Sequence, residues 1–293
     1  LSQTSGFSSY KDNMGEVLNQ GFELQVRGEV FRNRDWLVAL WGNMAHNKNK
    51  IVKISDSQRA YNQRVKDFYQ KGIVDMNYNG YEPQYAVPIS QYEEGQSLTS
   101  IWAVKSLGID PTTGKEIFLN RDGSVSDTWN ATQEVVVGNT EPKFNGSVGF
   151  NLAYKAWSLF AAFQYEWGGQ EYNQTLVDRV ENARIQYQNV DLRVLTDRWK
   201  QPGDIAQFKD IKNADNVTMP TSRFVQDKAY LRLSALTLSY DFNREWIKKH
   251  LGMNMLRLEA STRDFINWNS IRQERGLSYP KSWTVDFSIK AQF

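Results

Sequence analysis

The segment from Gly108 to Lys115 reads GIDPTTGK and has the glycine and lysine pattern of a phosphate-binding loop. It has one residue too many between its glycines, and Glu116 stands where that loop needs a Ser or Thr to bind magnesium. A backbone cradle for phosphate depends on that spacing, so the pattern indicates a structural turn. We expect no nucleotide to bind here.

Other residue types that carry catalysis are scarce or badly spaced. Asp110, Asp122 and Asp127 do not have the spacing of a calcium loop. The chain has no cysteine, and its two histidines, His46 and His250, lie far apart in the sequence. The chain therefore has few residues from which a nucleophile–base pair, or a metal site with thiolate or imidazole ligands, could be built. We expect a protein that is not an enzyme, with no catalytic residues, no cofactor and no metal.

The sequence is richer in residues suited to binding a ligand, here called the cargo, than in residues suited to catalysis. Rigid amphipathic rings can stack on sugar faces or hold peptide chains, and Arg can supply directed hydrogen bonds. The competing interpretation is that these side chains only pack within loops or against a partner. The candidates for cargo binding are Tyr81, Tyr85, Trp129, Tyr172, Arg198 and Trp199.

Composition restricts the class of protein without deciding it. The formal net charge of the 293 residues is +2, which argues against a nucleic-acid surface. No stretch approaches the ~20 apolar residues of a membrane-spanning helix. The mean hydropathy is −0.61. Strands of a membrane barrel alternate apolar and polar residues, so a low mean is compatible with them.

The clearest element is the final segment, 282–293. Apolar and polar residues alternate through it without error to a terminal aromatic, which predicts a strand with one lipid-facing side. The apolar side consists of Trp283, Val285, Phe287, Ile289, Ala291 and Phe293.

A second clear signal is a pair of alternating runs, 143–154 and 157–167, separated by Lys155 and Ala156. A two-residue connection between such runs predicts a β-hairpin. Eleven residues tilted in a barrel wall rise roughly 28 Å, which matches the apolar band of a membrane barrel. Aromatic residues near both strand ends would lie at the membrane interfaces.

Weaker alternation predicts further strands near 17–32, 35–47, 227–242 and 252–265. In the third of these the apolar side changes between Ala235 and Leu236, which indicates a bulge or an inward apolar patch. Long segments, 48–142, 168–226 and 266–281, alternate with short turns after residues 32 and 154 and a modest turn at 243–251. Barrels in outer membranes have long extracellular loops and short periplasmic turns. We therefore expect the long segments to be extracellular and the short turns to be periplasmic.

The fold class predicted is therefore all-β, a transmembrane antiparallel β-barrel of which residues 1–293 form the last seven or so strands. An open edge is not tolerated in lipid, so the remainder of the barrel must come from sequence outside this chain. Leu1 follows no basic or apolar leader, and we expect it to lie within a longer protein.

Five sequence blocks in order resemble the SusC/RagA family of TonB-dependent importers of Bacteroidota. The first contains a GIDP-x-TGK turn with a following DG, and the fourth contains a YLRL strand. The last is a YP pair followed by a terminal aromatic strand. The blocks occupy residues 98–123, 137–146, 197–204, 223–240 and 277–293.

This resemblance implies an outer-membrane location, contact with membrane lipid, and a barrel like the plugged transporters of about 22 strands. It also implies an N-terminal plug, outside this chain, that couples to TonB. A SusD-like lipoprotein lid would deliver an oligomeric nutrient, and we favour glycan over peptide. Nothing in the composition or spacing of this chain indicates those partners.

Three other functions remain open. A siderophore or cobalamin receptor would lack the lid, but the GIDP and YLRL blocks argue against it. An enzymatic or adhesive barrel would need reactive groups on inward positions. A soluble all-β binding module would stay in solution without detergent.

Overall fold

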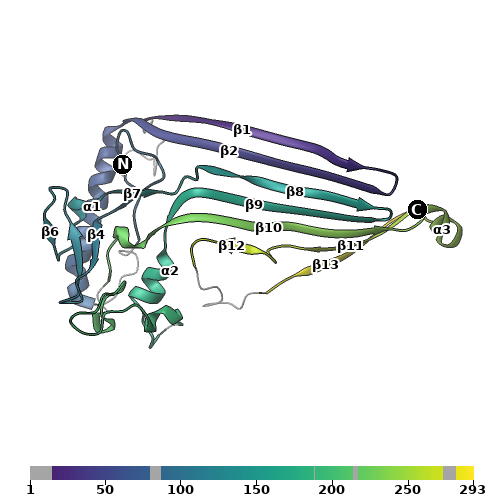
Figure 1. The fold of residues 1–293 in the computed structure, drawn as a ribbon. Coiled ribbons are helices and arrows are strands. Elements are labelled where there is room, and N and C mark those ends of the chain that lie inside the picture. The colour runs from purple at the N-terminus through teal and green to yellow at the C-terminus, as the bar shows by residue number, and fades with distance from the viewer. Residues whose placement is uncertain (1–14, 80–86, 188, 214–216, 273–281) are drawn as a thin grey trace, which may run out of the picture. The chain divides into compact units, whose positions relative to one another are not determined.

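The computed structural model describes residues 15–79, 87–187, 189–213, 217–272 and 282–293. Its largest element is an 8-stranded sheet with the order β1-β2-β8-β9-β10-β11-β13, in which β12 pairs with β10 (Figure 1). The strands of this sheet are β1 (Gly15–Arg32), β2 (Trp36–Ile54), β8 (Phe144–Tyr154), β9 (Trp157–Tyr172), β10 (Val225–Asp241), β11 (Met255–Thr262), β12 (Asn267–Asn269) and β13 (Val285–Gln292).

The chain divides into two compact units. We call the first the wall unit, and it comprises Gly21–Asn47, Glu141–Asn173 and Gln226–Phe293. We call the second the loop unit, and it comprises Leu1–Gln20, Lys48–Thr140 and Gln174–Val225. Each is described separately.

The hairpin β8–β9 is the best-defined part of the wall unit. Phe144 lies opposite Trp167 and Tyr154 opposite Trp157, with unbroken antiparallel pairing between them. Lys155 in the connection has a φ of 51°, in the left-handed region that two-residue hairpin turns require. The sequence predicted an end of the second strand at 167, whereas β9 continues to Tyr172.

One face of the wall unit is apolar from strand to strand. The pairing places Leu40 opposite Phe150, and Phe150 opposite Ala161. Near the end of the chain, Phe287 is 83% exposed and Ile289 is 72% exposed. Burying such side chains is favourable by about 25 cal/mol per Å², so this face matches the lipid-facing band of a barrel rather than a surface in water.

Aromatic rings gather at the two ends of this apolar band. At one end the rings of Trp36 and Tyr154 lie 4.3 Å apart, and those of Trp157 and Tyr240 lie 4.8 Å apart. At the other end Phe265 and Trp283 lie 5.2 Å apart. Amphipathic rings prefer the interface between lipid and water, so these pairs have the positions of two membrane girdles.

The opposite face of the wall unit carries polar pairs. Arg257 Nε donates to Asp241 Oδ1 at 2.6 Å, and Lys290 Nζ donates to Glu259 Oε2 at 2.8 Å. A barrel lumen is polar, so the alternation of the strands and this charge pairing agree.

The predicted change of side within β10 lies where its pairing partner changes from β12 to β11. Leu236 pairs with Thr262, and Arg232 pairs with Asn267. The segment from Thr262 to Asn267 therefore has one residue more than the stretch of β10 that it faces. Asp264, in that stretch, has a φ of 57°. The exposed leucines of β10 are Leu231 and Leu238, at an odd and an even position, so the change of apolar side is present in the structure.

The turn predicted at 243–251 is a short helix, α3 (Arg244–Leu251). Asn243 caps it by accepting a hydrogen bond from Trp246 N at 3.1 Å, and Gly252 ends it with a φ of 70°. Asn at the N-cap and Gly after the last turn are the usual helix boundaries, so the sequence carried this signal although we predicted only a turn.

The segment predicted as one long loop, 48–142, contains regular structure. The strand β2 continues to Ile54, and the helix α1 (Asp56–Asn79) follows. Two small sheets then form, one from β3 (Ser100–Ala103) and β7 (Val135–Asn139), the other from β4 (Lys105–Ile109), β5 (Glu116–Leu119) and β6 (Val125–Ser126). Within the described residues, no helix is sufficiently long and apolar to cross a membrane.

The second long segment is built from short helical turns. They are α2 (Gln174–Leu176), the π-helical turn η4 (Val177–Glu181), η5 (Leu192–Leu195), η6 (Ile211–Asn213) and η7 (Ser222–Phe224), and η3 (Ala131–Gln133) is a similar turn in the first segment. Such short pieces have few backbone bonds of their own, so side chains must hold them in place.

Gly149 in β8 is a point of close approach in the wall unit. A Cβ there would lie 2.4 Å from Ala161 O and 2.5 Å from the ring of Trp41. Trp41 in turn stacks on Phe160, with ring centroids 6.3 Å apart. The missing side chain therefore makes room for an aromatic pair on the polar face.

We predict that Gly149→Ala destabilises the barrel by about 1–3 kcal/mol, because the added methyl group overpacks against backbone and ring. Gly28→Ala is the matched control, since a Cβ at Gly28 meets nothing within 4 Å. The measurement is the temperature at which the full-length barrel loses its heat-modifiable mobility in gel electrophoresis. Equal transition temperatures for the two variants would contradict the prediction.

Candidate functional site

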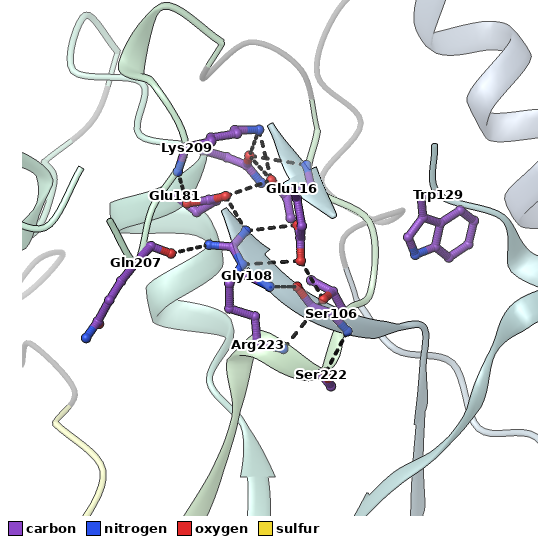
Figure 2. A network of polar contacts seen from close by, with 12 residues as sticks. Ser106, Gly108, Glu116, Trp129, Glu181, Gln207, Lys209, Ser222 and Arg223 are labelled. Atoms are coloured by element: carbon purple, nitrogen blue, oxygen red, sulfur yellow. Dashed lines mark hydrogen bonds and ion pairs between the residues drawn. The ribbon is translucent and has the colours of Figure 1, made fainter. Parts of the chain in front are cut away.

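The loop unit is organised around the guanidinium of Arg223, in η7 (Figure 2). Its Nη2 lies 2.9 Å from Glu116 Oε2 and 2.5 Å from Glu181 Oε1. Its Nη1 donates to Gln207 O at 2.6 Å. The side chain of Arg223 is 11% exposed, and those of Glu116 and Glu181 are 9% and 0% exposed. The charges therefore compensate one another away from water.

These ion pairs determine the charge state of the cluster. Burial alone would lower the pKa of Arg223, but Glu181 and Glu116 outweigh it and raise that pKa. Arg223 is therefore fixed as a cation between two carboxylates. Such an arrangement holds segments together, because the buried charges cannot separate without a large desolvation penalty.

Lys209 extends the cluster on the far side of Glu181. Its Nζ donates to Asn182 Oδ1 at 3.0 Å and to Thr218 Oγ1 at 2.8 Å. Burial lowers the pKa of Lys209 to about 8, although Glu181 favours the charged form. These bonds join Asn182, at the end of η4, to Lys209 and Thr218. Lys209 is buried and is therefore not available to a ligand from solvent.

The GIDPTTGK turn at 108–115 and the sequence block at 197–204 pack directly against each other. Trp199 Nε1 donates to Pro111 O at 2.8 Å, and Gly203 N donates to the same oxygen at 2.9 Å. A Cβ at Gly114 would lie 2.6 Å from the indole ring of Trp199. Gly114 also has a φ of 70°, so the position requires glycine for two reasons.

Two of the predicted cargo residues are therefore engaged in the fold. Trp199 is half-buried on the Gly114 turn. Arg198 is buried, and its guanidinium donates to the carbonyl oxygens of Val194, Lys209 and Glu181 at 2.9 to 3.0 Å. Their geometry corresponds to the competing interpretation, loop packing. Arg198 in particular is not available to a cargo in this arrangement.

Trp129 is placed differently, because it lines a cavity of about 310 Å³ in the loop unit. Its Nε1 donates to Pro220 O at 2.9 Å, and its ring meets that of Tyr69 edge-on at 5.5 Å. In Figure 2 it stands apart from the Arg223 network. Of the predicted cargo residues, Trp129 is the one that lines this cavity.

The helix α1 supplies the support behind Trp129. Ser55 Oγ accepts a hydrogen bond from Gln58 N at 3.2 Å at the start of the helix. Val65 and Tyr69 are buried on one side of it. Tyr69 Oη donates to Val87 O at 2.6 Å and accepts from Ile89 N at 3.0 Å. Burial raises the pKa of Tyr69, and the nearby Glu134 raises it further.

Glu134 is a buried carboxyl group behind the same cavity wall, 1% exposed. Gln91 Nε2 donates to its Oε2, and its Oε1 has no hydrogen-bond partner within the described part of the chain. Burial raises the pKa of Glu134 from 4.5 to about 8, although Gln91 and nearby cations oppose the shift. The group is therefore protonated at neutral pH.

The remaining predicted cargo residues contribute less to a site. Tyr81 and Tyr85 lie outside the described residues. Tyr172 ends β9 in the wall unit and is half-buried. Over the described ranges, no group of three or more His, Asp or Glu is arranged to hold a metal ion.

The structure adds an exposed apolar segment that the sequence analysis missed. Asp191 caps η5 by accepting from Arg193 N at 2.9 Å, and Asp191 N donates to Arg179 O at 3.1 Å. The backbone is thus well anchored, while four large apolar side chains of this segment are 61% to 80% exposed. We call them the apolar rim; they are Ile185, Tyr187, Leu192 and Leu195. The sequence signal was weak, because the residues follow no regular period.

The chain is similar to known proteins over most of its length. No family model matches it. It is 25% identical to TonB-dependent receptor P3 of Formosa agariphila over 92% of this chain and 26% of that protein. It is 21% identical to TonB-dependent receptor P39 of the same organism over 100% of this chain and 32% of that protein. The chain thus spans about a quarter to a third of the length of these relatives.

Solved structures with this fold include those of RagAB. The RagAB peptide importer in its open-open state matches with a TM-score of 0.71 at 20% identity, over 100% of this chain and 30% of that chain. A second structure of the RagAB peptide transporter matches with a TM-score of 0.67 at 19% identity, over 92% of this chain and 28% of that chain.

The fold and the relatives together identify a portion of an antiparallel β-barrel that is similar to TonB-dependent receptors and to RagAB. The resemblance to SusC/RagA-type transporters is thereby confirmed, as is the all-β fold of a barrel portion. The names of these relatives describe receptors and transporters rather than enzymes.

We predict that Arg223→Ala destabilises the loop unit by about 3–5 kcal/mol, because it leaves Glu116 and Glu181 buried without a counter-charge. Arg59→Ala is the control, since Arg59 makes only exposed pairs with Asp56 and Glu94. The measurement is the rate of thermolysin cleavage within 174–225 in the full-length protein. Unchanged cleavage of Arg223→Ala would show that the network does not hold these segments.

We also predict a pH dependence that comes from Glu134. Its pKa in the folded protein is raised to about 8 from an ordinary value of 4.5, so folding binds its proton. The associated stability is present below about pH 4.5 and is lost as the pH rises towards 8. Glu134→Gln keeps a neutral acceptor for Gln91 and should flatten this decline.

The measurement for Glu134 is the thermal midpoint between pH 5 and pH 9, followed by tryptophan fluorescence. Glu94→Gln changes a carboxylate that is about half exposed in the same unit and should retain the wild-type profile. An identical slope for wild type and Glu134→Gln would exclude Glu134 as the source.

Proposed function

We propose that this chain forms part of the wall and mouth of a TonB-dependent importer that carries an oligomeric nutrient across the outer membrane. The observation that carries the proposal is the combination of a lipid-facing antiparallel wall with sequence similarity to TonB-dependent receptors along 92% to 100% of the chain. Import would be active, with energy coupled through TonB.

The loop unit has the size and construction of a mouth rather than of simple connections. Its helical turns are tied by buried charges, and its two small sheets give it a core of its own. Long loops with internal packing are expected on the extracellular side of outer-membrane barrels. On this proposal they meet the cargo before it enters the lumen.

The apolar rim supports a protein partner on the loop unit. Tyr187 is 80% exposed and Leu192 is 71% exposed, although the segment beneath them is anchored. Clustered apolar side chains in water favour a covering surface, and aromatic residues are enriched in interface cores. A SusD-like surface lipoprotein that acts as a lid is the partner we propose for this rim.

A glycan is the cargo class that we favour over a peptide. The cavity beside Trp129 has an aromatic wall, and its described lining residues are uncharged, which suits neutral hydroxyl-bearing ligands. RagAB, which has a similar fold, is a peptide importer, and a peptide is therefore the direct alternative.

The test is uptake of fluorescently labelled oligomers by cells that lack the full-length gene. We predict loss of oligosaccharide uptake, unchanged uptake of monosaccharide, and a block by a protonophore that removes TonB energy. Loss of ferric siderophore or cobalamin uptake instead would assign the protein to the alternative receptor class and overturn the proposal.

The lid is tested in the same strain by Leu192→Asp combined with Leu195→Asp. A charge in the apolar rim should abolish co-purification of the lipoprotein and lower uptake, because an unpaired charge would be buried in the interface. Val125→Asp is the matched control, since Val125 is an exposed apolar residue of β6. Retention of the lipoprotein by the rim variant would refute this role.

A further inference from the structure

The described residues that line the cavity beside Trp129 are polar but uncharged, apart from Trp129 itself and Ala131. Its amide side chains come from α1, from the turn after β5 and from η3, and they are Gln70, Asn120, Asn130 and Gln133. Ser126 and Thr128 add hydroxyl groups, and Ala131 contributes a small apolar area. These described side chains offer hydrogen-bonding groups rather than a counter-charge to a ligand.

Several of these polar groups are held in place by bonds at one end of the side chain. Asn130 Oδ1 accepts from Thr132 N at 2.9 Å, and Asn120 Nδ2 donates to Ser124 Oγ at 2.9 Å. Gln133 Oε1 accepts from Arg121 N at 2.9 Å. The other ends of the two Asn amides, Asn130 Nδ2 and Asn120 Oδ1, then supply a donor and an acceptor, so ordering them costs a ligand little.

Trp129 forms a rigid wall of the cavity. Its only polar atom already donates to Pro220 O, so the indole offers an apolar ring surface rather than a hydrogen bond. Tyr69 supports the ring edge-on, and Tyr69 is itself fixed by bonds to Val87 O and Ile89 N. A preorganised ring beside paired donors and acceptors is a common way to hold a ligand with one apolar and one polar side.

The size of the cavity limits what it can take. About 310 Å³ lies at the lower end of the roughly 300–1,000 Å³ typical of small-ligand pockets. It suits one ring-sized unit of a larger molecule. A sugar ring has C–H faces for an indole and hydroxyl groups that both donate and accept.

We infer that this cavity is a binding subsite for one unit of a neutral saccharide, with Trp129 as its stacking wall and the surrounding amides as its hydrogen-bonding partners. A peptide side chain is the competing occupant. The inference rests on the proposed import function only in that the saccharide would be the cargo.

The test is equilibrium binding by the purified full-length transporter in detergent. The probes are an array of neutral glycans, an acidic oligogalacturonide and a pool of tetrapeptides. We predict that at least one neutral glycan binds and that Trp129→Ala weakens it about tenfold. That change corresponds to about 1.4 kcal/mol. Trp246→Ala removes an exposed Trp of α3 and should leave the affinity unchanged.

Two further variants separate binding from folding. Trp129→Phe keeps an aromatic ring against Tyr69 and should retain most of the affinity. Gln70 is exposed, so Gln70→Ala removes a lining amide without disturbing the interior and should weaken binding about threefold. Neutral glycans that bind equally well to Trp129→Ala and Gln70→Ala would overturn the inference, as would an absence of glycan binding.

The outcomes also distinguish the inference from the import function. If tetrapeptides bind in a Trp129-dependent manner and the cells import peptides, the transporter assignment stands and the saccharide subsite is wrong. If neutral glycans bind at Trp129 but the deletion strain still imports oligomers normally, the subsite stands and the import proposal fails.

Discussion

The loop unit depends on one buried cation. Arg223 joins a short strand through Glu116, a π-helical turn through Glu181 and an irregular segment through Gln207 O. Each segment has few backbone bonds of its own, and the charges cannot separate without a large desolvation penalty. The positions of Trp199 and of Pro220, the acceptor for Trp129, follow from where these segments are held. The shape of the loop unit, including the proposed binding cavity, is therefore set by electrostatics within the unit rather than by an apolar core alone.

The wall could be predicted from the sequence because its signal is local. In a strand, neighbouring side chains point to opposite sides. A strand with one side in lipid therefore shows alternating apolar and polar residues in its sequence. The run from Trp283 to Phe293 and the hairpin around Lys155 show this, and their pairing follows. The phase change in β10 was also visible, whereas the irregular segment around Asp264, between β11 and β12, could not be inferred from any local pattern of β10.

The site was harder to predict because its chemistry is made by contacts between distant segments. Arg198 and Trp199 look like ligand-binding residues in isolation, yet their donors are used by carbonyl groups of the fold. The apolar rim could not be inferred, since exposure of irregular apolar residues is decided by packing. α1 and α3 carried cap residues at their starts that we did not use for prediction. Trp129 was predicted to bind cargo from its residue type alone, and the cavity that it lines becomes visible only in the three-dimensional arrangement.

The contact between Gly114 and Trp199 links two turns that are far apart in the sequence. The glycine exists because the indole occupies the space of a side chain, and the indole is held by Pro111 O of the same turn. Neither turn has a reason for its shape without the other. For anyone exchanging loops between related transporters, the two segments form a single module. If 108–115 alone were replaced by a loop with a side chain at position 114, that side chain would clash with the indole ring of Trp199. Exchanging 108–115 together with 197–204 would preserve the contact.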